Sequence, residues 1–185
     1  MKTTICLFAI CVVFASVTIA ADPARPSAAK IMDSQLTMIE KEFVSLAEAM
    51  PAEKYGFAPT GGEFKGVRTF GQQVSHTAAV IYAVAAAVLV EKNPTDMGNQ
   101  ENGPASLKTK EDFVKYLKDS FAYAHKAMAT LTSANLTELV PSAFGSGKAS
   151  RLSMASVAVW HSFDHYGQMV VYARMNGIVP PASRR

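Results

Sequence analysis

Cysteine is almost absent from this chain of 185 residues, which contains only Cys6 and Cys11. Both lie in a continuous apolar run, residues 5–19, that follows a single lysine and precedes two alanines. This three-part pattern predicts a secretory signal peptide over residues 1–20. The run is short for a membrane-spanning helix, which needs about 20 apolar residues, so we expect cleavage rather than a permanent anchor.

A signal peptide implies export to the periplasm or out of the cell. Its cleavage would remove both cysteines, so the mature chain would have no thiol, no disulfide and no cysteine metal ligand. Residues 21–27 contain Pro and Ser and are expected to form a linker, followed by a single domain over residues 28–182. A mature chain of about 165 residues without disulfides must be stabilised by its core, and a chain of that size can bury a sufficient one.

The chain also lacks a large excess of charge of either sign. The 18 Lys and Arg residues are nearly balanced by 15 Asp and Glu residues, which leaves a formal net charge of +3. The chain lacks the basic runs interleaved with aromatic residues that are typical of nucleic-acid binding. We therefore expect no nucleic-acid partner and, after cleavage, no stable membrane span.

A convincing strand pattern is absent, whereas apolar residues recur with helical spacing in four stretches. This pattern predicts an all-α fold, a four-helix bundle with long connecting loops. The expected helices span residues 28–50, 69–90, 109–132 and 149–175, and the long loops span residues 51–66, 95–107 and 136–147.

Local signals mark several of these helix ends. Pro51 ends the first helix, and Thr109 with Asp112 three residues later approximates a capping box at the start of the third. Asn176-Gly177 is a typical stop for the fourth helix. Internal repeats and glycine-rich phosphate loops are lacking.

Histidine is scarce, with only four copies. His161 and His165 lie four residues apart in an apolar stretch, so a helix places both imidazoles on one face, one turn apart. Two imidazoles so placed can bind one metal ion at about 2.0–2.1 Å. His76 lies in a second apolar helix and can supply a third ligand, whereas His125 is expected to be a surface or structural residue.

Other polar side chains share the faces that carry these histidines. On a helical wheel, Asp164 and Gln168 lie on the arc of the histidine pair, and Gln73 lies near His76. Buried polar groups need partners, and one metal ion would satisfy two imidazoles at once. Asp164 can orient a ligand by accepting a hydrogen bond from its other ring nitrogen, as acceptors near ligating imidazoles usually do.

Spacing alone leaves several interpretations open. A histidine pair four residues apart is more often hydrogen-bonded or partly exposed than metal-bound, which would make this a plain bundle. Three histidines without a fourth ligand instead describe an open site, whose bound water or thiol nucleophile a divalent ion would activate. No Glu follows His161, which removes the zinc-protease pattern, and no Gly-x-Ser-x-Gly elbow is present.

Three segments together resemble the DinB-like (DinB/YfiT) superfamily of metal-binding four-helix bundles. They are residues 55–59 (Tyr-Gly-Phe-Ala-Pro), residues 70–76 (Phe-Gly-Gln-Gln-Val-Ser-His) and the block from His161 to Pro181, which is the most specific. The resemblance covers residues 28–182 and implies a bundle of the DinB/YfiT type. It also implies a divalent metal ion, usually zinc or nickel, bound by His76, His161 and His165.

The resemblance further implies a small-molecule substrate or ligand and a homodimer, because thiol-dependent transferases and dimers occur among these proteins. Export departs from the cytosolic location of the thiol enzymes. Our first hypothesis is an exported, metal-dependent hydrolase or transferase. The alternative is a non-catalytic bundle that binds a metal or small ligand. Trp160 is expected to be a packing residue.

Overall fold

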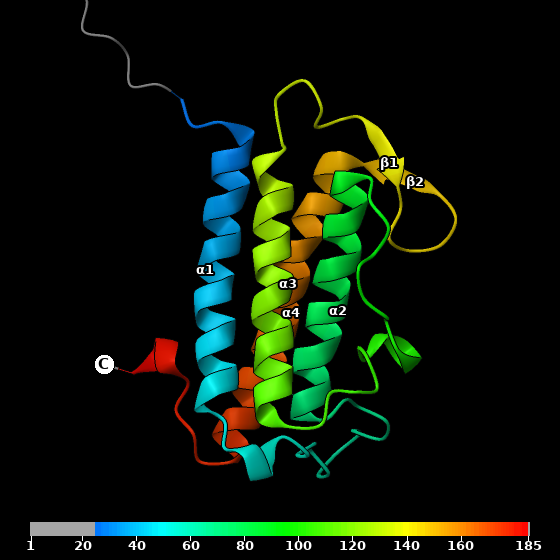
Figure 1. Ribbon diagram of the computed structural model, residues 1–185. Coiled ribbons are helices and arrows are strands. Elements are labelled where there is room, and N and C mark those ends of the chain that lie inside the picture. The colour runs from blue at the N-terminus through cyan, green and yellow to red at the C-terminus, as the bar shows by residue number, and fades with distance from the viewer. Residues whose placement is uncertain (1–24, 185) are drawn as a thin grey trace, which may run out of the picture.

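Four long helices form most of the structure, a computed structural model that describes residues 25–184 (Figure 1). They are α1 (Ala28–Ala49), α2 (Phe70–Leu89), α3 (Lys110–Ala129) and α4 (Arg151–Met175). Both α1 and α2 pack against α3 and α4, which places α1 and α2 at opposite corners of the bundle. The predicted all-α four-helix bundle with long connecting loops is confirmed.

The direction of the helices explains one of the long loops. In Figure 1, α1 and α4 run downward, whereas α2 and α3 both run upward. Because α2 and α3 are parallel, their connection must travel the length of the bundle, and it descends along the outside of α2. This connection carries the short 3-10 helix η2 (Asn99–Glu101).

Helix ends follow the signals in the sequence. The side chain of Ser27 caps α1, and Thr109 forms a complete capping box with Asp112 at the start of α3. Gly177 follows the end of α4 with φ of +74°, a left-handed conformation that glycine adopts without strain. The largest error is at the end of α3, which stops at Ala129 rather than at residue 132.

A small hairpin corrects the prediction that residues 136–147 form only a loop. Strands β1 (Leu139–Pro141) and β2 (Lys148–Ser150) pair antiparallel, with Val140 opposite Ala149. Each strand has three residues, which is too short to show the alternation by which strands are recognised in sequence. The hairpin leads directly into α4.

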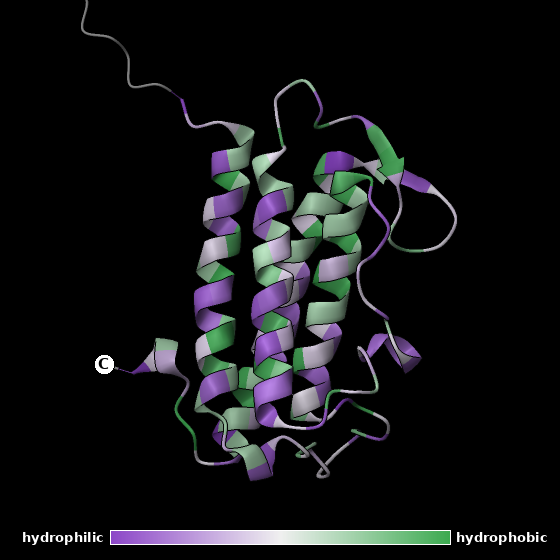
Figure 2. Ribbon diagram, in the orientation of Figure 1, coloured by the Kyte–Doolittle hydropathy of each residue, from purple (hydrophilic) through white to green (hydrophobic). Residues whose placement is uncertain are grey.

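The core is centred on α2. Among the described helices, α2 alone is long and apolar enough to cross a membrane by length and composition, but 78% of that window is buried in the protein. The other helices carry more hydrophilic residues, which alternate with hydrophobic ones along α1 and α3 in Figure 2. Fully buried side chains from those helices include Phe43, Phe121 and Met169. Helix α2 is therefore a core helix, packed on most sides.

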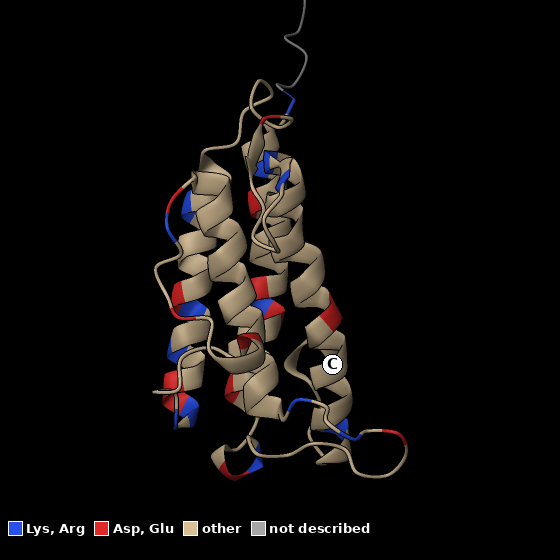
Figure 3. Cartoon of the chain, turned by 90° about the vertical axis from the view of Figure 1, so that its right-hand side faces the viewer, with Lys and Arg blue, Asp and Glu red and all other residues tan. Residues whose placement is uncertain are grey.

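Acidic and basic residues are intermixed along the outside of the bundle (Figure 3). One exposed pair connects two helices, since Lys118 Nζ of α3 lies 2.5 Å from Glu48 Oε1 of α1. The predicted signal peptide, residues 1–20, lies outside the described residues. Of the predicted linker, residues 25–27 are described, and they lead into the cap of α1.

Candidate metal centre

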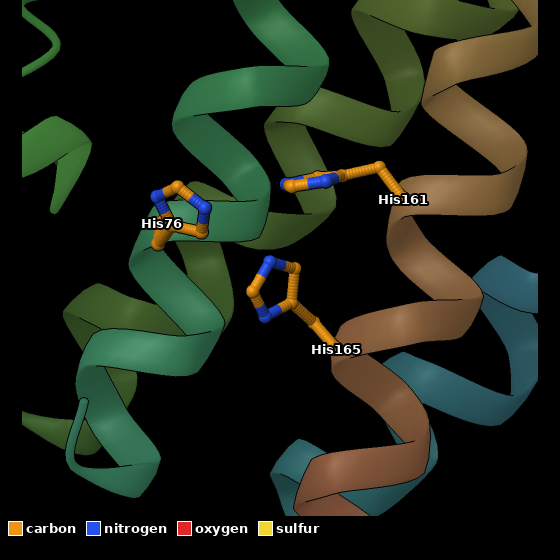
Figure 4. Close-up of side chains that lie close together, drawn as sticks. All are labelled: His76, His161 and His165. Atoms are coloured by element: carbon orange, nitrogen blue, oxygen red, sulfur yellow. The ribbon is translucent and has the colours of Figure 1, made fainter. Parts of the chain in front are cut away.

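Three imidazoles meet between α2 and α4. His76 comes from α2, and His161 and His165 come from successive turns of α4, so that the three rings surround one common space (Figure 4). The ring centroids are 5.2 Å apart for His76 and His161, 4.7 Å for His76 and His165, and 4.4 Å for His161 and His165. One ring nitrogen of each histidine lies within 4.8 Å of the other two, an arrangement that can hold a metal ion.

Hydrogen bonds at the start of α2 fix the position of His76 along the bundle axis. Backbone N–H groups of Phe70 and Gly71 donate to the carbonyl oxygens of Phe57 and Tyr55, each at 2.8 Å. A Cβ on Gly71 would lie only 3.2 Å from the ring of Tyr55 and 3.3 Å from its carbonyl oxygen, so glycine permits this close approach. The segment around residues 55–57 therefore anchors the helix that carries the first histidine.

His76 is oriented by the backbone of η2. Its Nδ1 lies 3.0 Å from the carbonyl oxygen of Glu101. Because a carbonyl oxygen only accepts, Nδ1 must carry the proton, and Nε2 keeps its lone pair. The Glu101 carboxylate is also near, with Oε2 at 3.9 Å from the same Nδ1. The carbonyl oxygen and Oε2 of Glu101 therefore both lie on the Nδ1 side of the ring.

His165 is oriented by a chain of side chains that crosses from α4 to α2 and back. Its Nδ1 donates to Oε1 of Gln73 at 2.5 Å, and Nε2 of Gln73 donates to Oε1 of Gln168 at 3.0 Å. Nε2 of Gln168 in turn donates to Asp164 at 3.3 Å. Every donor in this chain faces an acceptor, so the network assigns the proton of His165 to Nδ1 and leaves Nε2 free.

His161 carries the clearest sign of a missing partner. Its Nε2 is a buried atom without a hydrogen-bond partner among the described residues. A buried polar group without a partner is costly in free energy, and such groups in a folded protein often mark an ion or a water. This atom and the two free Nε2 atoms are the donors that a divalent ion bound by imidazoles requires.

Burial keeps the three rings neutral. Burial, and after it the neighbouring imidazoles and Arg68, lower the pKa of His165 to about 3 and that of His161 to about 4. The pKa of His76 is also lowered, first by burial and then by the charge of Arg68. Metal binding requires deprotonated imidazole, and all three rings meet that requirement at neutral pH.

The spacing of the rings suits an ion after a small movement. Two nitrogens bound to one tetrahedral ion are about 3.3 Å apart when each metal–nitrogen distance is about 2.0–2.1 Å, compared with at most 4.8 Å here. His76 and His165 are buried, whereas His161 is half-buried. Glu101 also lines a surface cavity of about 330 Å³ beside the alanines of α2.

The structure brings together His76, His161 and His165 but places Asp164 differently from the prediction. Asp164 is exposed and hydrogen-bonds no imidazole directly; it ends the chain through Gln168. Gln73 and the Glu101 carbonyl orient the rings instead. The prediction that Trp160 is a packing residue is wrong, since it is 56% exposed beside His161.

Two contributors were missed for different reasons. Gln73 already stood near His76 on the polar face of the second helix, and that position was the available signal. Glu101 lies in an irregular connection, where no periodicity indicates which residue meets α2. His125, outside the cluster, is a structural residue as predicted, with ring nitrogens at 2.6 Å from Asp33 and 3.0 Å from Glu40.

These features define a class of protein, a helical bundle with a three-histidine cluster between two antiparallel helices. The family model described as the DinB superfamily matches residues 35–169, and the chain belongs to that superfamily. A search of curated proteins finds no match.

Solved structures of the same fold include two DinB-like proteins of Bacillus. The Bacillus cereus protein is 14% identical, with a TM-score of 0.64 over 81% of this chain and 93% of its own. The Bacillus subtilis protein is 17% identical, with a TM-score of 0.62 over 84% of this chain and 99% of its own. A putative member of the DinB family from Exiguobacterium sibiricum is 16% identical, with a TM-score of 0.61 over 83% and 95%. At these identities the similarity concerns the fold.

Proposed function

We propose that the chain binds one divalent metal ion through Nε2 of His76, His161 and His165. The observation that carries this proposal is the buried Nε2 of His161, which has no partner among the described residues. In the other two rings Nε2 is also free, because Nδ1 of His76 is bound to the Glu101 carbonyl and Nδ1 of His165 is bound to Gln73. Membership of the DinB superfamily supports the same site.

Zinc or nickel fits this donor set best. Three neutral imidazoles without thiolate or carboxylate suit borderline ions such as zinc and nickel, whereas calcium and magnesium prefer oxygen ligands. Both ions also match the resemblance of the sequence to metal-binding bundles. The proposal therefore predicts a clear preference for zinc or nickel over calcium or magnesium.

The first function that we propose is that of a metal-dependent hydrolase or transferase acting on a small molecule. Three protein ligands leave a coordination position open, as in catalytic zinc sites. When bound, the ion supplies Lewis-acid activation of a nucleophile at neutral pH. His161 is half-buried whereas His76 and His165 are buried, which favours approach of a small molecule from the His161 side.

One observation favours the second candidate, a non-catalytic module that binds a metal or small ligand. Catalysis of hydrolysis usually requires a positioned acid or base. Among residues 25–184, the two carboxylates near the cluster are Glu101, on the Nδ1 side of His76, and Asp164, which pairs with Gln168. Neither is held at the free nitrogens where a ligand would bind.

Elemental analysis of protein purified without a histidine tag tests the site. We expect about one equivalent of zinc or nickel and a higher melting temperature on addition of that ion. His161→Ala should lose both effects, whereas the matched control His125→Ala should retain the metal because His125 lies outside the cluster. Less than a tenth of an equivalent in the wild type, with no shift in melting temperature, would rule out the site.

Activity measurements distinguish the metal-dependent enzyme from the non-catalytic binding module. The metal-loaded protein would be screened against ester, amide and thiol-transfer substrates, with His161→Ala as control. Activity that disappears in His161→Ala supports the enzyme, and activity that persists excludes metal catalysis.

We also propose that the chain is exported. N-terminal sequencing of the protein recovered from the periplasm or medium tests this, and a mature chain that still begins at Met1 would contradict it.

A further inference from the structure

Arg68 is tied to both sides of the histidine cluster. It directly precedes Thr69, the cap of α2. Its Nε donates to Oδ1 of Asn102 at 2.8 Å, and its Nη2 donates to the carbonyl oxygen of Gln100 at 2.9 Å. On the other side, the hydroxyl of Tyr172 in α4 donates to the backbone carbonyl of Arg68 at 3.2 Å. The guanidinium is therefore held in one place.

The segment that holds Arg68 also holds His76. Gln100 accepts from Arg68, and the next residue, Glu101, accepts from His76. Both residues have positive φ, +53° and +58°, in the left-handed region that costs a non-glycine residue free energy. Adjacent carbonyls of one constrained segment thus hold both the guanidinium of Arg68 and the imidazole of His76.

The constraint has a visible cause. Met97 and Gly103 close the segment through a hydrogen bond of 2.8 Å from the N–H of Gly103 to the carbonyl of Met97. A Cβ on Gly98 would lie 1.8 Å from the carbonyl oxygen of Gly103, so only glycine allows this closure. The loop from residue 97 to 103 is therefore a preformed support rather than a freely moving connection.

Arg68, Glu101 and Asp164 are the charged side chains that act on the three rings, and only a bound divalent ion would make their sum positive. Burial and then other charges lower the pKa of the three histidines, and Arg68 contributes to this effect on each of them. Glu101 and Asp164, both exposed, are the acids that act in the opposite direction on these rings. A divalent ion together with Arg68 would outweigh these two carboxylates.

Part of the guanidinium remains available to a ligand. Nε and Nη2 are engaged, but Nη1 has no hydrogen-bond partner among the side chains and backbone of residues 25–184. Arginine binds carboxylate and phosphate groups with well-defined geometry and keeps its charge at all relevant pH values. A half-buried arginine beside a site for a cation is therefore suited to an anionic ligand.

We propose that the centre takes an oxyanion ligand, a carboxylate or phosphate group, and that Arg68 is the residue that selects it. This inference rests on the proposed metal site and specifies the class of substrate or ligand that the site accepts. The ion and the guanidinium would both attract the ligand's negative charge. A neutral ligand of similar size gains nothing from Arg68.

Anion binding to the cobalt-loaded protein tests this inference without a known substrate. Cobalt(II) replaces zinc in such sites, and its visible spectrum reports ligands that enter the open position. The mature chain would be titrated with inorganic phosphate, with acetate and with neutral imidazole. We compare the wild type with Arg68→Gln and with Arg174→Gln, a matched control that removes an exposed arginine elsewhere on α4.

We expect Arg68→Gln to weaken phosphate or acetate binding at least about tenfold, as the loss of a charged hydrogen bond does. Cobalt uptake and imidazole binding should stay within a few-fold of the wild type, and Arg174→Gln should match the wild type throughout. The inference is overturned if neither anion changes the wild-type spectrum, if both anions bind Arg68→Gln as they bind the wild type, or if imidazole binding falls in parallel. Whichever anion depends more on Arg68 identifies the ligand group.

Circular dichroism shows whether Arg68→Gln is folded, and a second variant tests the inference if it is not. Arg68→Lys keeps the charge but cannot make both hydrogen bonds to the loop, so anion affinity should fall between those of the wild type and Arg68→Gln. An Arg68→Lys protein with unchanged anion affinity would contradict selection by the guanidinium. Failure of the wild type to take up cobalt is a separate result, since it removes the metal site itself.

Discussion

Gln73 and His165 share a hydrogen bond of 2.5 Å that joins α2 to α4 inside the bundle. The amide oxygen of Gln73 can only accept, so this contact fixes the proton of His165 on Nδ1 and turns Nε2 toward the other two histidines. Gln73 is itself held by Gln168. The packing of two helices and the chemical state of a candidate ligand thus depend on one buried amide.

Replacing this amide should weaken metal binding. Gln73→Ala leaves Nδ1 of His165 without its acceptor, and loss of such a partner typically costs about 10–100-fold in metal affinity. Stability of the metal-free protein should fall by about 1–3 kcal/mol, because a buried donor is left unsatisfied. Zinc titration and urea unfolding measure the two effects. Gln35→Ala, on the exposed face of α1, is the control, and equal zinc affinity in both variants would refute the role of Gln73.

Gly98→Ala should disrupt the loop from residue 97 to 103. A Cβ there meets the Gly103 carbonyl at 1.8 Å, and φ of +68° adds a cost of about 1–2 kcal/mol for a residue with a side chain. We expect weaker metal binding as well as lower stability, since the loop orients His76. Gly167→Ala is the matched control, because a Cβ at Gly167 in α4 has no neighbour within 4 Å and should stabilise the helix by about 0.5–1 kcal/mol. Similar behaviour of the two variants in unfolding and zinc binding would show that the loop is dispensable.

His125 should make the stability of the bundle depend on pH. Burial of its ring lowers its pKa, but the hydrogen bonds from its two nitrogens to Asp33 and Glu40 outweigh burial, so the pKa is raised above its usual value of 6.5. A raised folded-state pKa contributes stability that is fully present below 6.5 and is lost as the pH rises through the folded value. His125→Gln should therefore cost about 0.5–1 kcal/mol at pH 5.5 and much less at pH 9.

Comparing the variant with the wild type at each pH cancels the titration of other groups. Lys118→Gln is the control, because Lys118 also connects α3 to α1, through Glu48, without involving a histidine. Its cost should be the same at both pH values. A cost of His125→Gln that rises with pH would contradict the assignment.

Metal removal should lower the melting temperature without unfolding the bundle. The core side chains lie throughout the four helices, whereas the cluster occupies one level between α2 and α4. An ion present at 100 times its dissociation constant should add about 2.7 kcal/mol of stability. Calorimetry and far-ultraviolet circular dichroism with and without a chelator measure this. Loss of helical signal at room temperature in the chelated protein would mean that the fold depends on the ion.

Much of the fold could be predicted because its determinants are local. Helical spacing of apolar residues, the capping box at Thr109 and the Asn176-Gly177 stop each depend on neighbours within a few residues. The spacing of His161 and His165 is equally local, which is why a helix places them together. The sequence places His76 on a polar patch of its helix, but its proximity to His161 and His165 depends on how the helices pack together.

The remaining features depend on contacts between distant parts of the chain. The pairing of Gln73 with Gln168 requires the relative height of two helices, which no local pattern gives. Arg68 and His76 both bind a loop in which two residues other than glycine, Gln100 and Glu101, adopt the left-handed conformation against their intrinsic preference. The exposure of Trp160 is likewise set by which face of α4 the other helices cover.

The three histidines come from two helices that are widely separated in the sequence, in a chain whose described part contains no cysteine. An ion held between them would act as a reversible cross-link that closes a long loop, and closing a long loop removes conformational freedom from the unfolded chain. In an exported protein this would give a tether that chelation or acid releases and that reducing agents leave intact.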